Sequence, residues 1–396
     1  MSKNADSKHT AKGITRRVRL IIDISSLYGR DILKGVARFS QEYSNWEFEA
    51  DIHYFSKPLQ MSAEFVKEKF DGVIVWTYNK GMLKKTLDSG IPAIVKGIDK
   101  PVAGYINFIT DDLLIAKMAH EYFRGLGLTS IAYCGLDSQD WSKPRQFALE
   151  RIAADNGTEL VVYPAPRIKK MREWKNEMPL LIEWLKQLPK PIGLLAANDL
   201  RGKQILEACR KAAIDVPSEI AVLGVDDDEC ICPFTNPPLS SISRFCEAAG
   251  YEAAKALDCL MAGRPADATA IIIEPNKVVV RQSTDKIAVK NQTLADAVHY
   301  IRSNAEKHLT VEGVAKHVSA HPRWLHEQFK KQIGHTVHDE IRKVRVDKIA
   351  EMLLETDLTI YQIAYELNLK SPDQIARYFR KQKGMSPSEF RGKYKH

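Results

Sequence analysis

One stretch decides the fold of the C-terminal part of this 396-residue chain: Thr359-Ile-Tyr-Gln-Ile-Ala-Tyr-Glu-Leu-Asn-Leu-Lys-Ser-Pro-Asp-Gln-Ile-Ala-Arg-Tyr-Phe-Arg-Lys-Gln-Lys-Gly384. Thr359 and Gln362 stand three residues apart at its start, which is the spacing of a helix capping box. Pro372 then opens a second helix, at a position where its missing N–H has no intrahelical partner to lose. Gly384 ends that helix. The stretch therefore predicts two short helices joined by a tight turn.

The same design occurs a second time, 49 or 50 residues earlier, over Thr310 to Gly334. Pro322 opens the second helix of that copy. Between the copies, residues 338–355 carry apolar side chains at helical spacing and predict one long helix. A stiff connector of this kind can hold two helices in neighbouring turns of the DNA major groove, about 34 Å apart. Two matching copies argue against the alternative, a plain helical bundle with solvated faces.

The second helix of each copy presents hydrogen-bonding and cationic side chains on its outward face. Side chains of these lengths reach base edges and phosphates from a helix in the major groove. The pattern therefore predicts binding to double-stranded DNA. The predicted DNA-binding residues are His321, Arg323, Trp324, His326, Lys330, Asp373, Gln374, Arg377, Arg380 and Lys381.

Positive charge is concentrated at the two ends of the chain. Residues 290–396 hold 19 Lys and Arg against 13 Asp and Glu, a net of +6 out of the chain's +8, and the first 19 residues hold a further +5. The middle is therefore slightly acidic. A basic block on a nearly neutral body is typical of a module that binds polyanions. We expect residues 1–17 to be a disordered basic tail rather than a second DNA-binding arm.

From residue 18 to about residue 280, short apolar runs alternate with amphipathic stretches. We expect strands at 18–23, 72–76, 92–96, 130–134, 159–163, 193–197 and 220–224, and helices at 31–42, 81–89, 111–126, 145–156, 176–187, 200–213 and 246–262. Such alternation is typical of parallel β-α-β units. The predicted fold class is a two-lobed α/β domain with parallel sheets (residues 18–282), a linker (283–292) and an all-α domain (293–396).

Several functional classes find no support in the sequence. No stretch approaches the ~20 apolar residues that cross a bilayer, and residues 1–19 lack the apolar core of a signal peptide. The six cysteines show neither a Cys-x-x-Cys pair nor zinc spacing, so we expect buried, reduced thiols in a cytoplasmic protein. Nucleotide-binding and hydrolase motifs are also missing. We expect no enzyme activity, no metal, no other cofactor and no membrane partner.

Polar side chains gather where the expected strands end, which is the edge at which parallel sheets bind ligands. The predicted ligand-binding residues are Asp226, Asn198, Arg145, Trp141 and Asp111. Carboxylates, an amide and an arginine can pair with adjacent hydroxyl groups, and an indole can stack on the apolar face of a sugar ring. The alternative for a single residue is a helix cap, and the acidic run Asp226 to Glu229 has a metal site or a solvated loop as alternatives. Jointly the residues predict a sugar site.

The C-terminal domain resembles the DNA-binding domain of AraC/XylS-type regulators, from about Thr293 to Tyr394. The stretch Tyr378-Phe-Arg-Lys-Gln-Lys-Gly-Met-Ser-Pro-Ser-Glu-Phe-Arg391, following the second copy, is similar to that family's motif. The resemblance implies that both second helices contact DNA and that the binding sites are tandem half-sites. Pro322 and Trp324 depart from the family, so its base preferences do not carry over.

The α/β body resembles the periplasmic-binding-protein-like sensor of LacI/GalR-type repressors. The matching stretches are Ala197-Asn-Asp199, Leu223-Gly-Val-Asp-Asp227, Pro238-Leu-Ser-Ser-Ile242 and Val279-Val-Arg-Gln-Ser-Thr284. The resemblance implies an effector cleft lined by Arg145, Asn198 and Asp226, and a homodimer. This chain departs by lacking that family's N-terminal helix-turn-helix.

Both resemblances on one chain imply a sugar-responsive activator of pentose catabolic genes. The implied partners are tandem sites on double-stranded DNA, D-xylose or another pentose, a second copy of the chain and RNA polymerase. One alternative is a constitutive DNA-binding protein whose body serves only dimerisation. The other is a carbohydrate enzyme with a nucleic-acid-binding tail.

Overall fold

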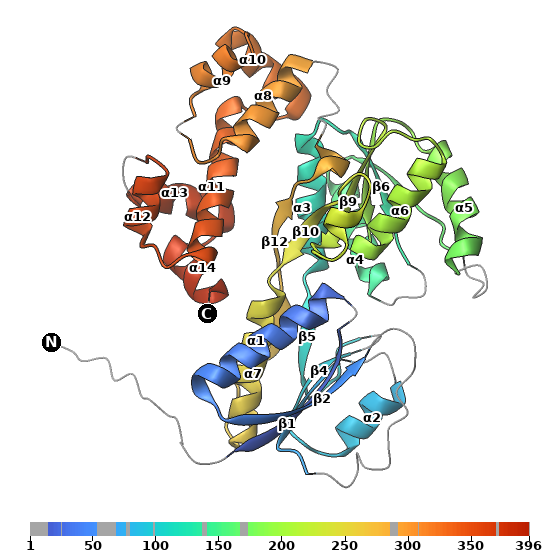
Figure 1. The fold of residues 1–396 in the computed structure, drawn as a ribbon, viewed down its shortest axis with the longest axis vertical. Coiled ribbons are helices and arrows are strands. Elements are labelled where there is room, and N and C mark those ends of the chain that lie inside the picture. The colour runs from blue at the N-terminus through green and yellow to red at the C-terminus, as the bar shows by residue number, and fades with distance from the viewer. Residues whose placement is uncertain are drawn as a thin grey trace, which may run out of the picture. The chain divides into compact units, whose positions relative to one another are not determined.

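The computed structural model describes residues 15–24, 26–53, 69–76, 80–97, 100–136, 141–166, 173–285, 292–307, 309–369 and 372–395. The chain divides into two compact units (Figure 1). The first unit comprises Met1–Asp111 and Phe245–Glu274, and the second comprises Asp112–Arg244 and Pro275–His396. The expected basic tail at 1–17 falls outside the described residues except for its last three.

The first unit is a parallel sheet with helices packed on it. Its six strands lie in the order β11-β5-β4-β3-β1-β2, and every paired neighbour runs parallel. The strands are β1 (Arg16–Asp23), β2 (Trp46–His53), β3 (Gly72–Trp76), β4 (Ala93–Lys96), β5 (Ile106–Thr110) and β11 (Ala270–Ile273). The helices are α1 (Leu27–Tyr43), α2 (Lys80–Asp88) and α7 (Cys246–Met261). All five residues of β3 are buried, as expected for a strand covered on both faces.

Two glycines let α1 and α7 approach closely. A Cβ atom on Gly35 would lie 1.9 Å from the Glu247 carbonyl oxygen, and one on Gly250 would lie 2.1 Å from the Ile32 carbonyl oxygen. Any side chain at either position would therefore collide with the backbone of the opposite helix. The pair of glycines fixes how these two helices cross in the first unit.

The second unit contains another six-stranded sheet and the helical domain, which we define as residues 292–395. The strands lie in the order β12-β10-β9-β8-β6-β7, with β12 antiparallel to β10 and the other pairs parallel. The strands are β6 (Ser130–Cys134), β7 (Glu159–Val162), β8 (Ile192–Ala196), β9 (Ile220–Asp226), β10 (Ser240–Arg244) and β12 (Pro275–Val279). The helices beside them are α3 (Asp112–Gly125), α4 (Ser142–Asp155), α5 (Trp174–Gln187) and α6 (Asp199–Lys211), with short 3-10 turns at Cys232–Phe234 and Gln282–Thr284.

The helical domain contains both predicted pairs of helices. Its helices are α8 (Gln292–Ser303), α9 (Val311–His317), α10 (Pro322–Gln328), α11 (Val337–Glu355), α12 (Ile360–Glu366), α13 (Pro372–Lys383) and α14 (Pro387–Tyr394), and a π-helical segment (Phe329–Ile333) extends α10. The capping box of Thr359 and Gln362 is confirmed, with both reciprocal hydrogen bonds present. Phe329 and Phe379 are fully buried at equivalent places in the two copies. The predicted fold class is confirmed.

Five strands were not predicted from the sequence, namely β2, β5, β10, β11 and β12. The reason is clearest in β10, where Ser-Ser-Ile-Ser-Arg offers one large apolar side chain. Ser240 and Ser241 are nevertheless completely buried, because their hydroxyl groups are hydrogen-bonded inside the unit. A pattern search that looks for apolar runs misses a strand of this kind.

The expected linker also differs from the structure at its start. Ser283 and Thr284 are completely buried and bonded to β10. They therefore belong to the α/β part of the second unit. Residues 286–291, the middle of the expected linker, lie outside the described residues.

None of the helices in the described part of the chain is long and apolar enough to cross a membrane. The six cysteines are free thiols, and four of them are buried, in agreement with expectation. Cys230 differs, since it is exposed. Among the described residues no group of three His, Cys, Asp or Glu side chains could hold a metal ion, the acidic run at Asp226 to Glu229 included.

Candidate functional site

Asp226 and Arg244 form a buried ion pair at the carboxyl ends of two neighbouring strands. β9 and β10 are parallel, and Ser243 pairs in register with Asp226. The side chains of Asp226 and Arg244 are only 9% and 6% exposed. Asp226 has a φ of 117°, a conformation that costs a non-glycine residue free energy and is typical of functional positions. The predicted carboxylate of Asp226 is thus paired with the guanidinium of Arg244, a partner that the sequence did not reveal.

The charge on Asp226 is set by opposing effects. Burial raises the pKa of its carboxyl group, and the guanidinium groups of Arg244 and Arg145 act against that rise. Two cations therefore face one carboxylate. Such a group can accept hydrogen bonds from a pair of sugar hydroxyls while the arginines donate to the same hydroxyl oxygens.

Arg145 is held by three neighbours in the second unit. Its Nε donates to Asp112 at 2.9 Å, and its Nη1 donates to the carbonyl oxygen of Ala197. Its guanidinium lies 5.7 Å from the centre of the Trp141 ring. Arg145 and Trp141 both come from the start of α4, so the helix positions the cation and the indole together. The predicted residues Trp141, Arg145 and Asp226 are therefore neighbours.

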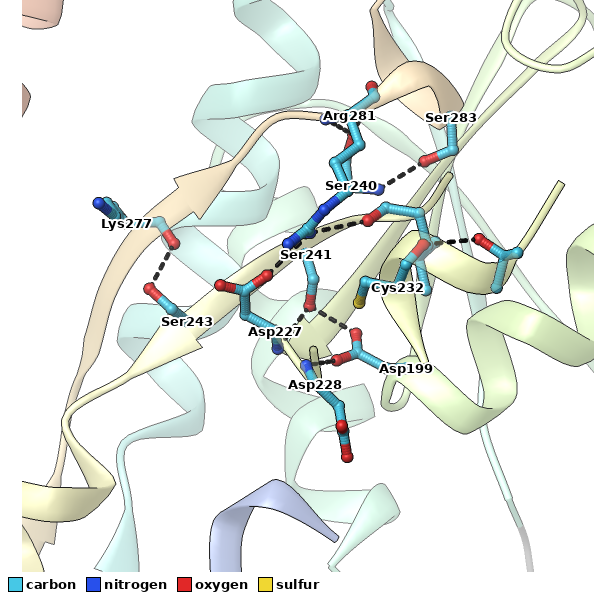
Figure 2. Close-up of polar contacts among 12 residues, drawn as sticks. Asp199, Asp227, Asp228, Cys232, Ser240, Ser241, Ser243, Lys277, Arg281 and Ser283 are labelled. Atoms are coloured by element: carbon cyan, nitrogen blue, oxygen red, sulfur yellow. Dashed lines mark hydrogen bonds and ion pairs between the residues drawn. The ribbon is translucent and has the colours of Figure 1, made fainter. Parts of the chain in front are cut away.

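Asn198 and Asp199 follow β8, and the structure gives both a structural role. Asn198 is the N-cap of α6, and its side chain accepts a hydrogen bond from the Arg201 N–H. Asp199 is almost completely buried, accepts from the Ser241 hydroxyl and from the Asp228 N–H, and its pKa is raised well above the usual range by burial and by Asp226. Figure 2 shows Asp199 joining Ser241 and Asp228. The cap alternative applies to Asn198, while its amide nitrogen remains a candidate ligand.

Three of the four carboxylates in the acidic run after β9 are buried or half-buried and paired with neighbours, so the run is not a solvated loop. Asp228 is 2% exposed and accepts from the Cys230 N–H. Asp227 pairs with Arg281 at 2.8 Å, as Figure 2 shows. Only Glu229 of the four is exposed. The carboxylates of the run mainly tie β9 to its neighbours.

Asp111 belongs to the first unit, and its part in ligand binding stays a prediction. Its N–H donates to the Ile273 carbonyl oxygen at 3.0 Å. The next residue, Asp112, is the carboxylate that pairs with Arg145. Arg244 is the cluster residue that sequence reasoning missed, whereas Asp112 lies in the Thr110–Asp112 stretch that the sequence points to, one residue after the predicted Asp111. A strand assignment at 240–244 would have pointed to Arg244.

The first predicted DNA-binding helix, α10 with its π-helical extension, presents part of the expected surface. Arg323 is 86% exposed in its side chain and pairs with Glu327 at 3.2 Å, and Lys330 is exposed as well. His321 is the N-cap of α10, and its Nδ1 accepts from the Arg323 N–H. Trp324 is half-buried against the core of the helical domain. The predicted reader Trp324 therefore also stabilises the domain, and His326 is likewise half-buried.

The second predicted DNA-binding helix, α13, is strongly basic at its C-terminal end. Arg377, Arg380 and Lys381 are exposed. The guanidinium groups of Arg377 and of Arg342 on α11 each lie 5.1 Å from the centre of the Tyr378 ring, which restrains the cation of Arg377 on this surface. The predicted readers Asp373 and Gln374 belong to α13, but their side chains lie outside the described residues.

Comparison with known proteins supports the fold predicted for the α/β body and for the helical domain. Residues 120–284 match a family described as a periplasmic binding protein-like domain, and residues 314–393 match a helix-turn-helix domain. The chain is 29% identical to the xylose operon regulatory protein of Haemophilus influenzae, over 95% of this chain and 98% of the relative. It is 26% identical to that of Escherichia coli K12, over 95% of this chain and 96% of the relative.

Solved structures give the same result. A structure described as the xylose-binding transcription activator xylR covers 97% of this chain and 99% of its own, with 25% identity and a TM-score of 0.59. A LacI family transcriptional regulator from Arthrobacter, in complex with lactose, covers 68% of this chain with 22% identity and a TM-score of 0.54, which supports the fold of the α/β body. Over nearly its whole length, this chain is similar to xylose operon regulatory proteins, and it matches a periplasmic binding protein-like domain followed by a helix-turn-helix domain.

Proposed function

We propose that this protein is a D-xylose-responsive transcription activator. Its helix-turn-helix pairs bind tandem half-sites on duplex DNA, and the cluster of Trp141, Arg145, Asp226 and Arg244 binds the sugar. The protein acts as a cytoplasmic homodimer that recruits RNA polymerase, and it catalyses no reaction. Homology to xylose operon regulatory proteins over 95% of the chain supports the choice of sugar.

One observation carries the proposal. A buried carboxylate flanked by two guanidinium groups lies beside an indole, on a chain that also carries two basic helical heads. A carboxylate and arginines bind hydroxyl pairs, and an indole binds the apolar face of a pyranose. When one helix-turn-helix pair has bound its half-site, the other pair on the same chain is held near the adjacent half-site, which raises its effective concentration there. Sensing and DNA reading are thereby combined in one molecule.

Calorimetry with a panel of pentoses tests the sugar half of the proposal. D-xylose should bind the wild-type chain, and Asp226→Asn should weaken that binding at least about ten-fold, because a charge-assisted acceptor is lost. Asp155→Asn, which changes an exposed carboxylate on α4, is the matched control and should bind as the wild type does. Melting curves of both variants establish that they fold.

If no pentose produced heat with the wild-type protein, the alternative of a constitutive DNA-binding protein with a dimerisation body would be favoured. Conversion of a bound sugar to product during long incubation would favour the enzyme alternative.

A further inference from the structure

A chain of buried hydroxyl groups leads from β10 to helix α3 in the second unit. The Ser240 N–H donates to the Ser283 hydroxyl at 2.8 Å, a contact visible in Figure 2. The Thr284 hydroxyl donates to the Ser240 hydroxyl at 2.6 Å, and the Tyr122 hydroxyl lies 2.7 Å from Thr284 Oγ1. Ser240, Ser283 and Thr284 are completely buried and Tyr122 is 5% exposed. Since water does not compete for these groups, each hydrogen bond depends on the position of the next.

On its other side, Tyr122 meets the helical domain. The guanidinium of Arg302, on α8, lies 5.8 Å from the centre of the Tyr122 ring. Arg302 Nε donates to Glu340 at 2.9 Å, and His335 Nε2 lies 2.9 Å from the other oxygen of that carboxylate. His335 directly follows Gly334, where the first DNA-binding helix ends. The contacts therefore run without interruption from β10 to that helix.

The ionic part of this path is well defined. The Glu340 side chain is 2% exposed. Its burial alone would raise its pKa, but the charge of Arg302 and the hydrogen bond from His335 bring the pKa down to about 2. Arg302 is therefore held at a fixed place, with its guanidinium available to the Tyr122 ring. A cation over an aromatic ring in a partly desolvated setting is a specific contact.

Buried apolar side chains of α3 and of the helical domain, Tyr122 and Ile301 among them, belong to one hydrophobic cluster. An open, mostly polar pocket of about 410 Å³ lies at its edge. Its lining includes His120, Glu121 and Arg124 of α3, and His335, Asp339 and Lys343 of the helical domain. Nearby, Lys277 of β12 pairs with Glu351 of α11 at 3.3 Å, and both side chains are 30% exposed. The contact between α3 and the helical domain therefore combines a buried apolar cluster with a polar, open edge, and because buried side chains are closely packed, a shift on one side is passed to the other.

We propose that the stack of Tyr122 on Arg302 is a coupling contact, through which the state of β10 is passed to the first DNA-binding helix. β10 also carries Arg244, the partner of Asp226. A sugar that rearranges the Asp226–Arg244 pair moves the end of β10, and the hydroxyl chain carries that movement to Tyr122. This inference rests on the proposed function, because the signal it transmits is sugar binding.

A double-mutant cycle on the full chain tests the contact. The probe is a DNA duplex that the wild-type protein selects from a random-sequence pool, and its Kd is measured with and without D-xylose. The variants are Tyr122→Leu, Arg302→Lys and the double variant. Arg302→Lys keeps a positive charge beside Glu340, and Arg151→Gln, which alters an exposed arginine of α4, is the control.

Each single variant should change the sugar-free Kd for DNA, or the ratio of the Kd values without and with sugar, by about five-fold, a typical coupling between two sites. The double variant should change the same quantity by no more than the larger of the two single effects. The Arg151→Gln control should match the wild type. Tyr122→Phe keeps the ring over Arg302 but loses the bond to Thr284. It should keep the sugar-free Kd and still reduce the ratio.

Additive effects of the two substitutions, or wild-type behaviour in all of them, would overturn the proposal. If the wild-type Kd for DNA did not respond to D-xylose, the proposed function would fail. The double-mutant cycle measured without sugar would then by itself test whether Tyr122 and Arg302 are coupled to DNA binding. Non-additive Kd values would support that coupling, and additive ones would overturn it.

Discussion

At the scale of single residues, the pair of Asp226 and Arg244 shows what a sequence reveals and what it hides. Asp226 was predicted because it follows an apolar strand, where α/β sheets place ligand-binding groups. Arg244 was not, because it ends a strand made mainly of serines. Arg145 and Trp141 were found by the same reasoning as Asp226, and the structure makes them neighbours. Burial and pairing, which decide the charge of a site, depend on elements that the pattern did not show.

The Asp226–Arg244 pair predicts the pH dependence of sugar binding. Burial raises the pKa of Asp226 and Arg244 opposes the rise, so Arg244→Gln should raise it further. If the ionised carboxylate binds the sugar, the pH below which affinity is lost should move upward in that variant. Calorimetric titration of D-xylose from pH 5 to pH 8 measures this, with Arg151→Gln as control. If Arg244→Gln and the wild type lost affinity for D-xylose at the same pH, the role given to Arg244 would be contradicted.

Glu340 predicts how acid affects stability. Its pKa is about 2 in the folded chain, against an ordinary value of 4.5, so its contribution is complete above pH 4.5 and disappears as the pH falls toward 2. The difference corresponds to about 3 kcal/mol of unfolding free energy. Urea unfolding at pH 6 and pH 3 should show a smaller loss in Glu340→Gln than in the wild type. An equal loss in both would show that Glu340 titrates normally.

At the scale of elements, helices were predicted better than strands. Helix ends carry local signals such as Thr359 with Gln362, and those signals act within four residues. The edge strand β2 and the serine-rich β10 depend on partners far along the chain, which a local pattern does not contain. The closeness of α1 and α7 was also beyond prediction, since it follows from glycines more than 200 residues apart.

Those glycines give a stability prediction. Gly250→Ala would place a Cβ atom 2.1 Å from the Ile32 carbonyl oxygen, so α7 must move from α1, at a cost of about 3 kcal/mol or more. Gly392→Ala, where nothing lies within 4 Å of the added atom, should leave stability unchanged or raise it by up to about 1 kcal/mol. Denaturant unfolding compares the two. Equal effects would mean that the helices are not in close contact.

At the scale of the whole molecule, the fold class and the order of the parts could be predicted, because periodicity and charge change where the fold changes. Sugar binding is assigned to the α/β body and DNA binding to the helical domain, so a substitution in one part should affect only the function of that part. Arg377→Ala should weaken DNA binding by about ten-fold or more through loss of a charged contact, and it should leave the D-xylose Kd unchanged. Anisotropy with labelled DNA and calorimetry with sugar measure the two. A change of similar size in both would mean that the substitution disturbs the fold rather than the contact.

In this protein, one molecule is proposed to bind a pentose in its α/β body and DNA with the second helix of each helix pair, and sugar binding is proposed to change the affinity for DNA. The most direct measurement is the Kd of the full chain for its selected duplex, with and without saturating D-xylose. We expect the Kd to change by about ten-fold, within the range usual for coupled sites. An identical Kd under both conditions, while calorimetry shows the sugar bound, would contradict this proposal.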